Sequence, residues 1–206
     1  MAVSVTATEP AASGFVTVTP CGQAPSGTSN LNFAVGATAA NLVVVAPGSD
    51  GSICVTSNVS THVVVDVFGA FTPAASLGLV TSARLVDTRL EPARRPGPGG
   101  GTVILQVRSR TDVADDATGV MLNLTAVDAT GDGFLTAYPC STGLPTASNL
   151  NVVRGGTRAN FVLVRPDASG DVCVFSSTGT DVVVDLLGWT GSVFAGITPA
   201  RAVDTR

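Results

Sequence analysis

The chain has 206 residues, of which 45% are hydrophobic and 13% are charged, and its net charge is −4. This composition excludes an intrinsically disordered protein, because it supplies enough apolar material for a folded core. The acidic balance disfavours nucleic acid as a partner, and no apolar run reaches the roughly 20 residues that a membrane-spanning helix needs.

The apolar residues are mostly Val, Leu and Ala in short runs, and 23 Gly and 12 Pro separate these runs. Val favours strands because its branched side chain is stiff and packs well on a pleated surface. None of the longer segments repeats its apolar residues with the period of about 3.6 that a helix requires. We therefore expect an all-β protein with little or no helix.

The chain contains one segment twice. Residues 4–71 align with residues 123–190 without a gap, and 28 of these 68 positions are identical. A second match lies outside this alignment, since RLVDTR at 84–89 returns as RAVDTR at 201–206. The duplication indicates two small domains rather than one large one.

The repeats divide the chain into four predicted parts. These are a first repeat without its opening segment (1–72), a linker (73–77), a complete second repeat (78–191) and the start of a third repeat (192–206). The chain therefore has the pattern of a slice from a longer tandem array. A repeat that lacks its first strand has a free sheet edge, so we expect strand addition by neighbouring repeats or by another copy.

Turn residues divide the complete repeat into eight short segments that we predict to be strands. In chain order they are 82–86, 102–108, 118–127, 133–138, 148–153, 159–165, 172–176 and 181–187. The Pro- and Gly-rich segment 91–101 is predicted to be a loop. This spacing is typical of an antiparallel β-sandwich, of either immunoglobulin-like or jelly-roll topology.

Each repeat contains two cysteines. Cys21 and Cys54 lie 33 positions apart, and so do Cys140 and Cys173. This pattern favours one disulfide per repeat and an oxidising, extracellular compartment. A metal site is the alternative, but it normally has CxxC spacing or histidine partners, and the chain has neither.

Two aspartates, Asp66 and Asp185, lie inside the apolar segments VVVDV and VVVDL. A carboxylate in such a strand needs an ion pair or hydrogen bonds. The motifs RLVDTR and RAVDTR offer partners, namely Arg84, Asp87, Arg89, Arg201, Asp204 and Arg206. We expect Asp185 to bind this motif or nearby backbone amides, which would tie the first and last strands of a repeat together. A catalytic carboxylate pair is disfavoured, because Glu is rare and aromatic residues are few.

Four asparagines alternate with apolar residues in SNLNF and SNLNV, namely Asn30, Asn32, Asn149 and Asn151. Period two places both amides of each repeat on one sheet face, where they could bind sugar hydroxyls. They could equally satisfy neighbouring turns, as we expect of Asn41 and Asn160. Trp189 is a further candidate for sugar contact, although the first repeat has Ala70 in its place.

Two further interpretations have less support. His62 is the only histidine, and without a second His or a GxSxG turn we expect a solvated residue at a strand start rather than a catalytic base. The acidic loops 128–133, 166–171 and 48–52 could supply oxygen ligands to Ca²⁺, but none matches a known calcium-binding motif. No other cofactor is expected.

The order of motifs RLVDTR, a Gly-rich loop, TVILQV, ATGVMLNLTAV, GFLTAYPC, SNLNV, ANFVLV, VCVFSS and VVVDLLGW resembles a known module. That module recurs in secreted and cell-wall-associated proteins of high-GC Gram-positive (actinobacterial) bacteria, often beside hydrolase domains. The resemblance covers nearly the whole chain, although the second repeat ends in Gly188-Trp189-Thr190 where the module has Gly-x-Phe. It implies an accessory role at the cell surface.

We expect a non-enzymatic, secreted module that acts as a spacer, adhesion or assembly element. The alternative is a carbohydrate-binding accessory module of a secreted hydrolase, with cell-wall or extracellular polysaccharide as its partner. An enzyme is disfavoured because no nucleophile–base pair and no metal cluster has a recognisable spacing.

Overall fold

The computed structural model describes the chain except residues 24–28, 72–76, 109, 111–112 and 192–193. The described part is all-β, as predicted, and one 3₁₀ turn, Pro92–Arg94, is its only helical element. No helix in this part has the length and the apolar character to cross a membrane. The strands form four antiparallel sheets, which build two β-sandwiches that we name the first and second modules.

The second module contains eight strands, one for each predicted segment. They are β7 (Leu77–Asp87), β8 (Gly101–Gln106), β9 (Gly119–Val127), β10 (Gly133–Pro139), β11 (Leu150–Val152), β12 (Arg158–Val164), β13 (Asp171–Ser176) and β14 (Asp181–Thr190). Their sheet orders are β12-β9-β14-β7 and β11-β10-β13-β8. β7 pairs with β14, β8 with β13, β9 with β12 and β10 with β11, so each pair encloses the next one along the chain. This is the pairing of one long hairpin that is folded into two layers. The sandwich is therefore a jelly roll rather than immunoglobulin-like.

Period-two burial explains why these segments are strands. In β9, Val120, Leu122 and Leu124 point into the core of the second module and are at most 1% exposed. Met121, between them, points to the opposite face and packs in a separate apolar cluster. The sheet that contains β9 thus has two apolar faces. One faces the core of the second module, and the other packs against a different part of the molecule.

The first module uses the same plan with one strand fewer. Its strands are β1 (Ala2–Thr8), β2 (Gly14–Pro20), β3 (Leu31–Phe33), β4 (Ala39–Val44), β5 (Ile53–Ser57), β6 (His62–Phe71) and β15 (Phe194–Asp204). The sheets have the orders β15-β6-β1-β4 and β3-β2-β5. By alignment of the repeats, β1 to β6 correspond to β9 to β14.

Strand β15 completes the first module from the far end of the chain. It pairs antiparallel with β6, and Arg201 lies opposite Asp66. This is the place that β7 occupies beside β14, where Arg84 lies opposite Asp185. The segment 192–206, expected to open a third repeat, thus supplies in its described part the strand that the first repeat lacks. Of the predicted linker 73–77, only Leu77 lies within the described residues, where it begins β7.

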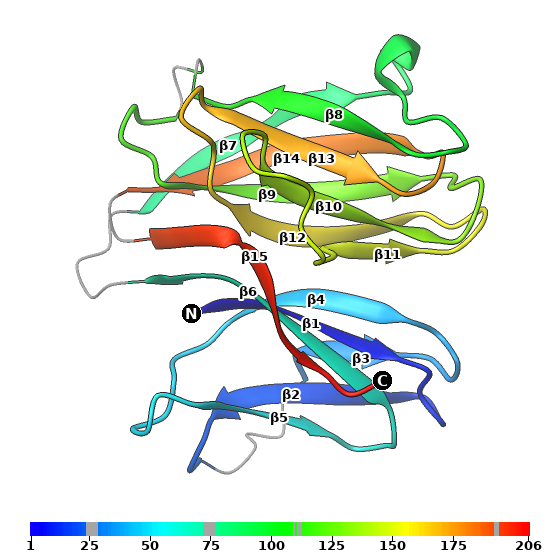
Figure 1. Ribbon diagram of the computed structural model, residues 1–206, viewed down its shortest axis with the longest axis vertical. Coiled ribbons are helices and arrows are strands. Elements are labelled where there is room, and N and C mark those ends of the chain that lie inside the picture. The colour runs from blue at the N-terminus through cyan, green and yellow to red at the C-terminus, as the bar shows by residue number, and fades with distance from the viewer. Residues whose placement is uncertain (24–28, 72–76, 109, 111–112, 192–193) are drawn as a thin grey trace.

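The two modules pack face to face, so the molecule is a stack of four sheets (Figure 1). An apolar cluster joins β1, β4 and β6 of the first module to β9 and β12 of the second. Ala2, Leu42, Phe68 and Leu163 form its buried part, and Phe68 is only 1% exposed. Burial of such side chains on both sheets stabilises the contact between the modules, so that they form one body and not two separate domains.

Both predicted disulfides are present. Cys21 bonds Cys54 and Cys140 bonds Cys173, each with a Cα–Cα distance of 4.9 Å. Each bond joins the end of one strand to its neighbour, β2 to β5 and β10 to β13. They indicate an oxidising environment.

Candidate functional site

A cleft of about 510 Å³ lies between the modules, where β3 and β4 approach β11 and β12. Its walls come from both repeats and combine small apolar side chains with amide, hydroxyl and guanidinium groups. The lining residues that the argument uses are Asn32, Phe33, Thr38, Asn151 and Arg158.

Two of the predicted ligand-binding asparagines, Asn32 and Asn151, meet in this cleft. Each is the middle residue of a three-residue strand, β3 or β11, whose outer two residues are buried. Because side chains alternate along a strand, burial of Leu31 and Phe33 turns Asn32 away from its core. The same alternation in β11 places Asn151 at the repeat-equivalent position, so the modules present one amide each to a shared space.

The cleft has unused hydrogen-bonding capacity. Asn32 is exposed, and the buried Nδ2 of Asn151 has no hydrogen-bond partner within the described part of the chain. Arg158 is exposed at the start of β12, and no described residue forms an ion pair with it. The exposed side chains of Asn32 and Arg158 can therefore donate hydrogen bonds to a polar ligand in the cleft.

The other two asparagines, Asn30 and Asn149, make the structural hydrogen bonds that were the alternative expectation for them. Asn30 Oδ1 accepts a hydrogen bond of 2.7 Å from Val18 N, and the carbonyl of Asn30 accepts one of 2.7 Å from Asn41 Nδ2. The second module repeats both bonds at 2.7 and 2.6 Å with Asn149, Ala137 and Asn160. The side-chain oxygens of Asn30 and Asn149 are thus used by the backbone of β2 and β10.

Trp189 lies outside the cleft. It is in β14, opposite Gly78 of β7, and its half-buried ring packs against the core of the second module. A Cβ placed on Gly78 would clash with the ring of Trp189. Trp189 therefore covers a glycine at a sheet edge instead of presenting a flat face to a ligand.

The charged motif of the second module forms a compact network. Arg84 Nε lies 2.5 Å from Asp185 Oδ1, and Arg84 Nη1 lies 2.7 Å from Asp87 Oδ2. Arg89 also binds Asp87, at 2.6 Å. Hydrogen bonds and charge from Arg89, with a weaker contribution from Arg84, lower the pKa of Asp87 to about 2. The network ties β7 to β14.

The first module contains the same network between segments far apart in the sequence. Arg201 lies 2.5 Å from Asp66 and 2.9 Å from Asp204, and Arg206 lies 2.7 Å from Asp204. The hydrogen bond from Arg206 lowers the pKa of Asp204, whereas burial outweighs Arg201 and raises the pKa of Asp66. Arg201 also donates to the carbonyl of Thr146 at 2.8 Å, so this network reaches across the module boundary.

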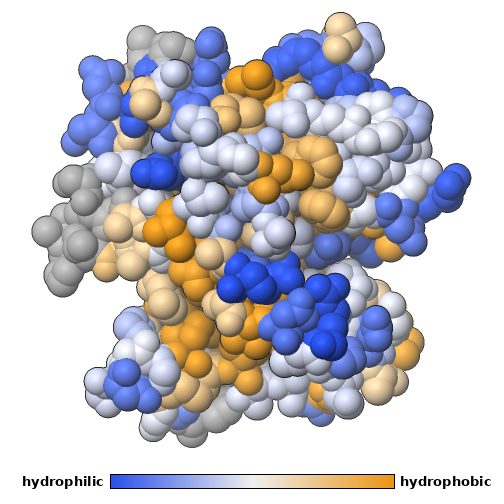
Figure 2. Space-filling view, viewed as in Figure 1, coloured by the Kyte–Doolittle hydropathy of each residue, from blue (hydrophilic) through white to orange (hydrophobic). Residues whose placement is uncertain are grey.

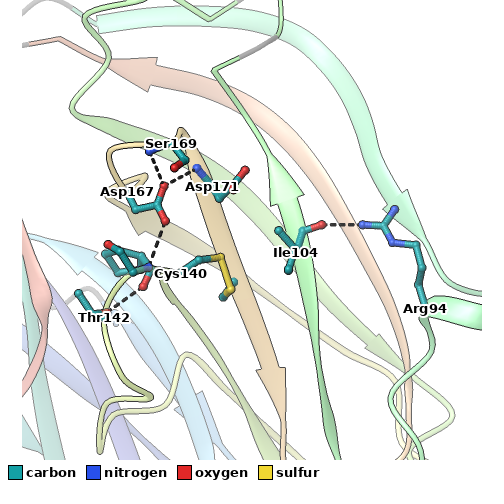
Figure 3. Close-up of a disulfide and its surroundings, with 10 residues drawn as sticks. Arg94, Ile104, Cys140, Thr142, Asp167, Ser169 and Asp171 are labelled. Atoms are coloured by element: carbon teal, nitrogen blue, oxygen red, sulfur yellow. Dashed lines mark hydrogen bonds between the residues drawn. A yellow bond between two sulfur atoms is a disulfide. The ribbon is translucent and has the colours of Figure 1, made fainter.

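The remaining candidates have local roles. His62 begins β6, and its Nδ1 lies 2.7 Å from the carbonyl oxygen of Thr205. Asp167 accepts hydrogen bonds from the backbone amides of Ser169, Asp171 and Ser141, which fixes the loop beside the Cys140–Cys173 disulfide (Figure 3). In the described part, no group of three or more His, Cys, Asp or Glu side chains could hold a metal ion.

Sequence reasoning missed Arg158 and the cleft itself. The first repeat has Ala39 in place of Arg158, so comparison of the two repeats gave no signal for this residue. The cleft arises only when β4 and β12 approach each other, and the sequence of a single repeat does not contain that information. No protein-family model, curated protein or solved structure matches this chain.

Proposed function

We propose that this chain is a non-enzymatic, secreted adhesion module that binds extracellular or cell-wall polysaccharide in the cleft between its two modules. The observation that carries the proposal is the meeting of Asn32 and Asn151, repeat-equivalent amides from separate modules, at one cleft. Secretion is supported by the two disulfides, which persist only in oxidising compartments.

The chemistry of the cleft suits a sugar chain. A side-chain amide donates and accepts hydrogen bonds in one plane, so the exposed amide of Asn32 can bind a pair of neighbouring hydroxyls. The guanidinium of Arg158 adds donors and favours a polymer that carries carboxylate or phosphate groups. The small apolar side chains of the walls, Ala34, Ala37 and Ala159, can contact the C–H surfaces of a pyranose ring.

The test uses the oxidised full chain against purified cell-wall fractions and neutral and acidic polysaccharides. We expect saturable retention on at least one polymer, and at least a tenfold loss of affinity for Asn32→Ala and for Asn151→Ala. If Arg158→Ala loses binding to acidic polymers but not to neutral ones, Arg158 is the group that recognises the carboxylate or phosphate of the polymer. The matched control is Asn58→Ser, because the second module has Ser177 at that position and both side chains accept a backbone hydrogen bond there.

A spacer that binds no ligand is the second candidate function. It is favoured because the strands of both modules are used extensively for pairing and for packing of the modules against each other. Absence of retention on every polymer, by a chain with an intact thermal unfolding transition, would replace the adhesion proposal with the spacer. Retention that the cleft variants leave unchanged would place the binding surface elsewhere and reject the cleft.

A further inference from the structure

Each asparagine of the cleft has a phenylalanine directly opposite it on the neighbouring strand. Phe15 of β2 pairs with Asn32 of β3, and Phe134 of β10 pairs with Asn151 of β11. The alignment of residues 4–71 with residues 123–190 makes these two pairs equivalent. Directly opposite residues of antiparallel strands have Cβ atoms about 5 Å apart on one sheet face. Each module therefore places an aromatic ring beside the amide that it presents to the cleft.

Both rings point away from the core of their module. Val16 and Leu135, the next residues along the two strands, are 0% exposed, so the alternation of side chains turns Phe15 and Phe134 to the outer sheet face. Phe15 is 36% exposed and Phe134 is half-buried. Neither ring is used to fill a core, although both repeats carry it.

Phe134 belongs to an apolar patch on the outer face of the second module. Its ring centroid lies 6.0 Å from that of the half-buried Phe175 of β13, with an interplanar angle of 54°. Ile104 of β8, which is 54% exposed, extends the patch on the same sheet face. Figure 2 shows hydrophobic residues grouped over β13 and β10. The first module has Thr56 in place of Phe175, so the feature common to both modules is the ring beside the amide and not the contact between two rings.

The two Phe–Asn pairs lie along one surface path. Asn32 and Asn151 both line the cleft between the modules, and so does Ser13, two positions before Phe15. Asn151 also lines a second pocket, of about 360 Å³, whose wall contains Phe134. A ligand that leaves the cleft past Asn151 therefore reaches one ring, and a ligand that leaves it past Asn32 reaches the other.

We propose that the two Phe–Asn pairs are aromatic subsites, one at each end of the cleft, for sugar rings of a linear acidic polysaccharide. The assignment of these subsites rests on the proposed function and names its ligand class. A pyranose ring has an apolar C–H face and a hydroxyl edge. The face of a phenylalanine ring carries partial negative charge and attracts the C–H groups, while the neighbouring amide of Asn32 can bind the hydroxyls.

The acidic character of the ligand follows from Arg158, which lies in the cleft between the two subsites. Its side chain is exposed, and no described residue forms an ion pair with it. A guanidinium binds a carboxylate through two parallel hydrogen bonds, so it favours a sugar acid over a neutral sugar. Because linked subsites act on one chain, a long oligosaccharide should bind much more tightly than a short one.

The test measures binding of the oxidised full chain to disaccharide and octasaccharide fractions of alginate, polygalacturonate and hyaluronan. Cellobiose and cellohexaose are the neutral probes. We expect at least one acidic octasaccharide to bind at least tenfold more tightly than the disaccharide of the same polymer. It should also bind at least tenfold more tightly than cellohexaose.

Variants of the two phenylalanines separate stacking on a ring from general apolar contact. Phe15→Leu and Phe134→Leu should each weaken octasaccharide binding at least fivefold, because leucine is apolar but has no ring face. Phe15→Tyr and Phe134→Tyr keep the ring and should change affinity less than twofold. The control Leu90→Ala removes an apolar side chain that is 80% exposed outside both pockets, and it should also change affinity less than twofold.

Nuclear magnetic resonance of the unaltered protein gives a second readout that does not depend on the folding of a variant. The ring signals of Phe15 and Phe134 should shift when the octasaccharide is added, whereas those of Phe68, which is 1% exposed between the modules, should not. Octasaccharide binding that Asn32→Ala weakens, but that leaves both rings and both leucine variants unaffected, would overturn the aromatic subsites and leave the proposed function intact.

Other outcomes overturn the ligand class or both proposals. Equal affinity for cellohexaose and the acidic octasaccharides would overturn the acidic class, and equal affinity for disaccharides and octasaccharides would overturn the pair of linked subsites. Failure of the folded parent chain to bind any of the probes would overturn the subsites together with the proposed function.

Discussion

At the scale of single residues, Asn149 and Asn151 of the second module lie two positions apart but have unequal surroundings. Asn149 is 1% exposed and its Oδ1 accepts a hydrogen bond from the amide of Ala137, whereas the Nδ2 of Asn151, two positions later, has no hydrogen-bond partner in the described part of the chain. Period two predicts both amides on one face of a strand, whereas Asn149 lies before β11 and its side chain binds the backbone of β10.

Removal of the Asn149 side chain should destabilise the protein. In Asn149→Ala the amide of Ala137 loses its acceptor inside the sandwich, which costs about 1–3 kcal/mol. Asn151→Ala removes no hydrogen bond and should change the free energy of unfolding by less than about 0.5 kcal/mol. Urea titrations of the two variants check this difference, and equal destabilisation would contradict it.

The two arginines of the repeated motif should differ in the same way. Asp66 has no exposed side-chain surface, whereas Asp185 keeps 20% of its own. Arg201→Ala leaves a buried carboxylate without its cation and should lower the free energy of unfolding by about 3–5 kcal/mol. Arg84→Ala acts at a half-exposed pair and should lower it by about 1 kcal/mol or less.

The loss in Arg201→Ala should depend on pH with a defined sign. Burial raises the pKa of Asp66 above its unfolded value, so the folded protein binds a proton more tightly than the unfolded chain. Stability from this group is full below the unfolded pKa and falls as the pH rises through the folded pKa. The deficit of Arg201→Ala relative to the parent should therefore shrink as the pH falls from 7 toward 4. A deficit that stays constant over this range would show that Asp66 is not the cause.

At the scale of elements, the disulfides hold strand ends that the backbone hydrogen bonds between paired strands leave free. Each closes a loop between cysteines 33 positions apart, for which the chain-entropy relation gives about 3–4 kcal/mol. Replacing Cys140 and Cys173 together by Ala should lower the free energy of unfolding by that amount. Guanidinium titrations measure it, and dithiothreitol, which reduces both disulfides, should give the parent a larger loss and leave a variant without disulfides unchanged.

The strands of the second module could be predicted from the sequence because turn residues separate nearly every pair. All eight predicted segments overlap strands, and the errors concern ends, such as β7, which begins at Leu77 instead of 82. The return of β15 could not be predicted. The RAVDTR strand has the same apolar pattern and charges whichever β6-like strand it pairs with, so local sequence does not specify its module.

At the scale of the whole molecule, β15 makes the first module depend on residues almost 200 positions away. Deletion of 194–206 would expose Val65 and Val67 and leave Asp66 without Arg201. We expect the first module to lose more than about 3 kcal/mol of stability. Hydrogen exchange should then become fast in β1, β4 and β6 while β8 and β13 remain protected. Uniform protection of both modules in the deleted chain would contradict this dependence.

The placement of β15 also determines how the protein responds to mechanical tension. Strands β1 and β15 lie on opposite sides of β6 and both run antiparallel to it, so they are parallel to each other. Ala2 lies beside Gly69 at one end of β6, whereas Asp204 lies beside Val64 near the other end. A pull on the two chain ends therefore acts along the strands, so many hydrogen bonds are sheared at once and none is unzipped singly. A domain loaded in this geometry resists extension until a high force is reached.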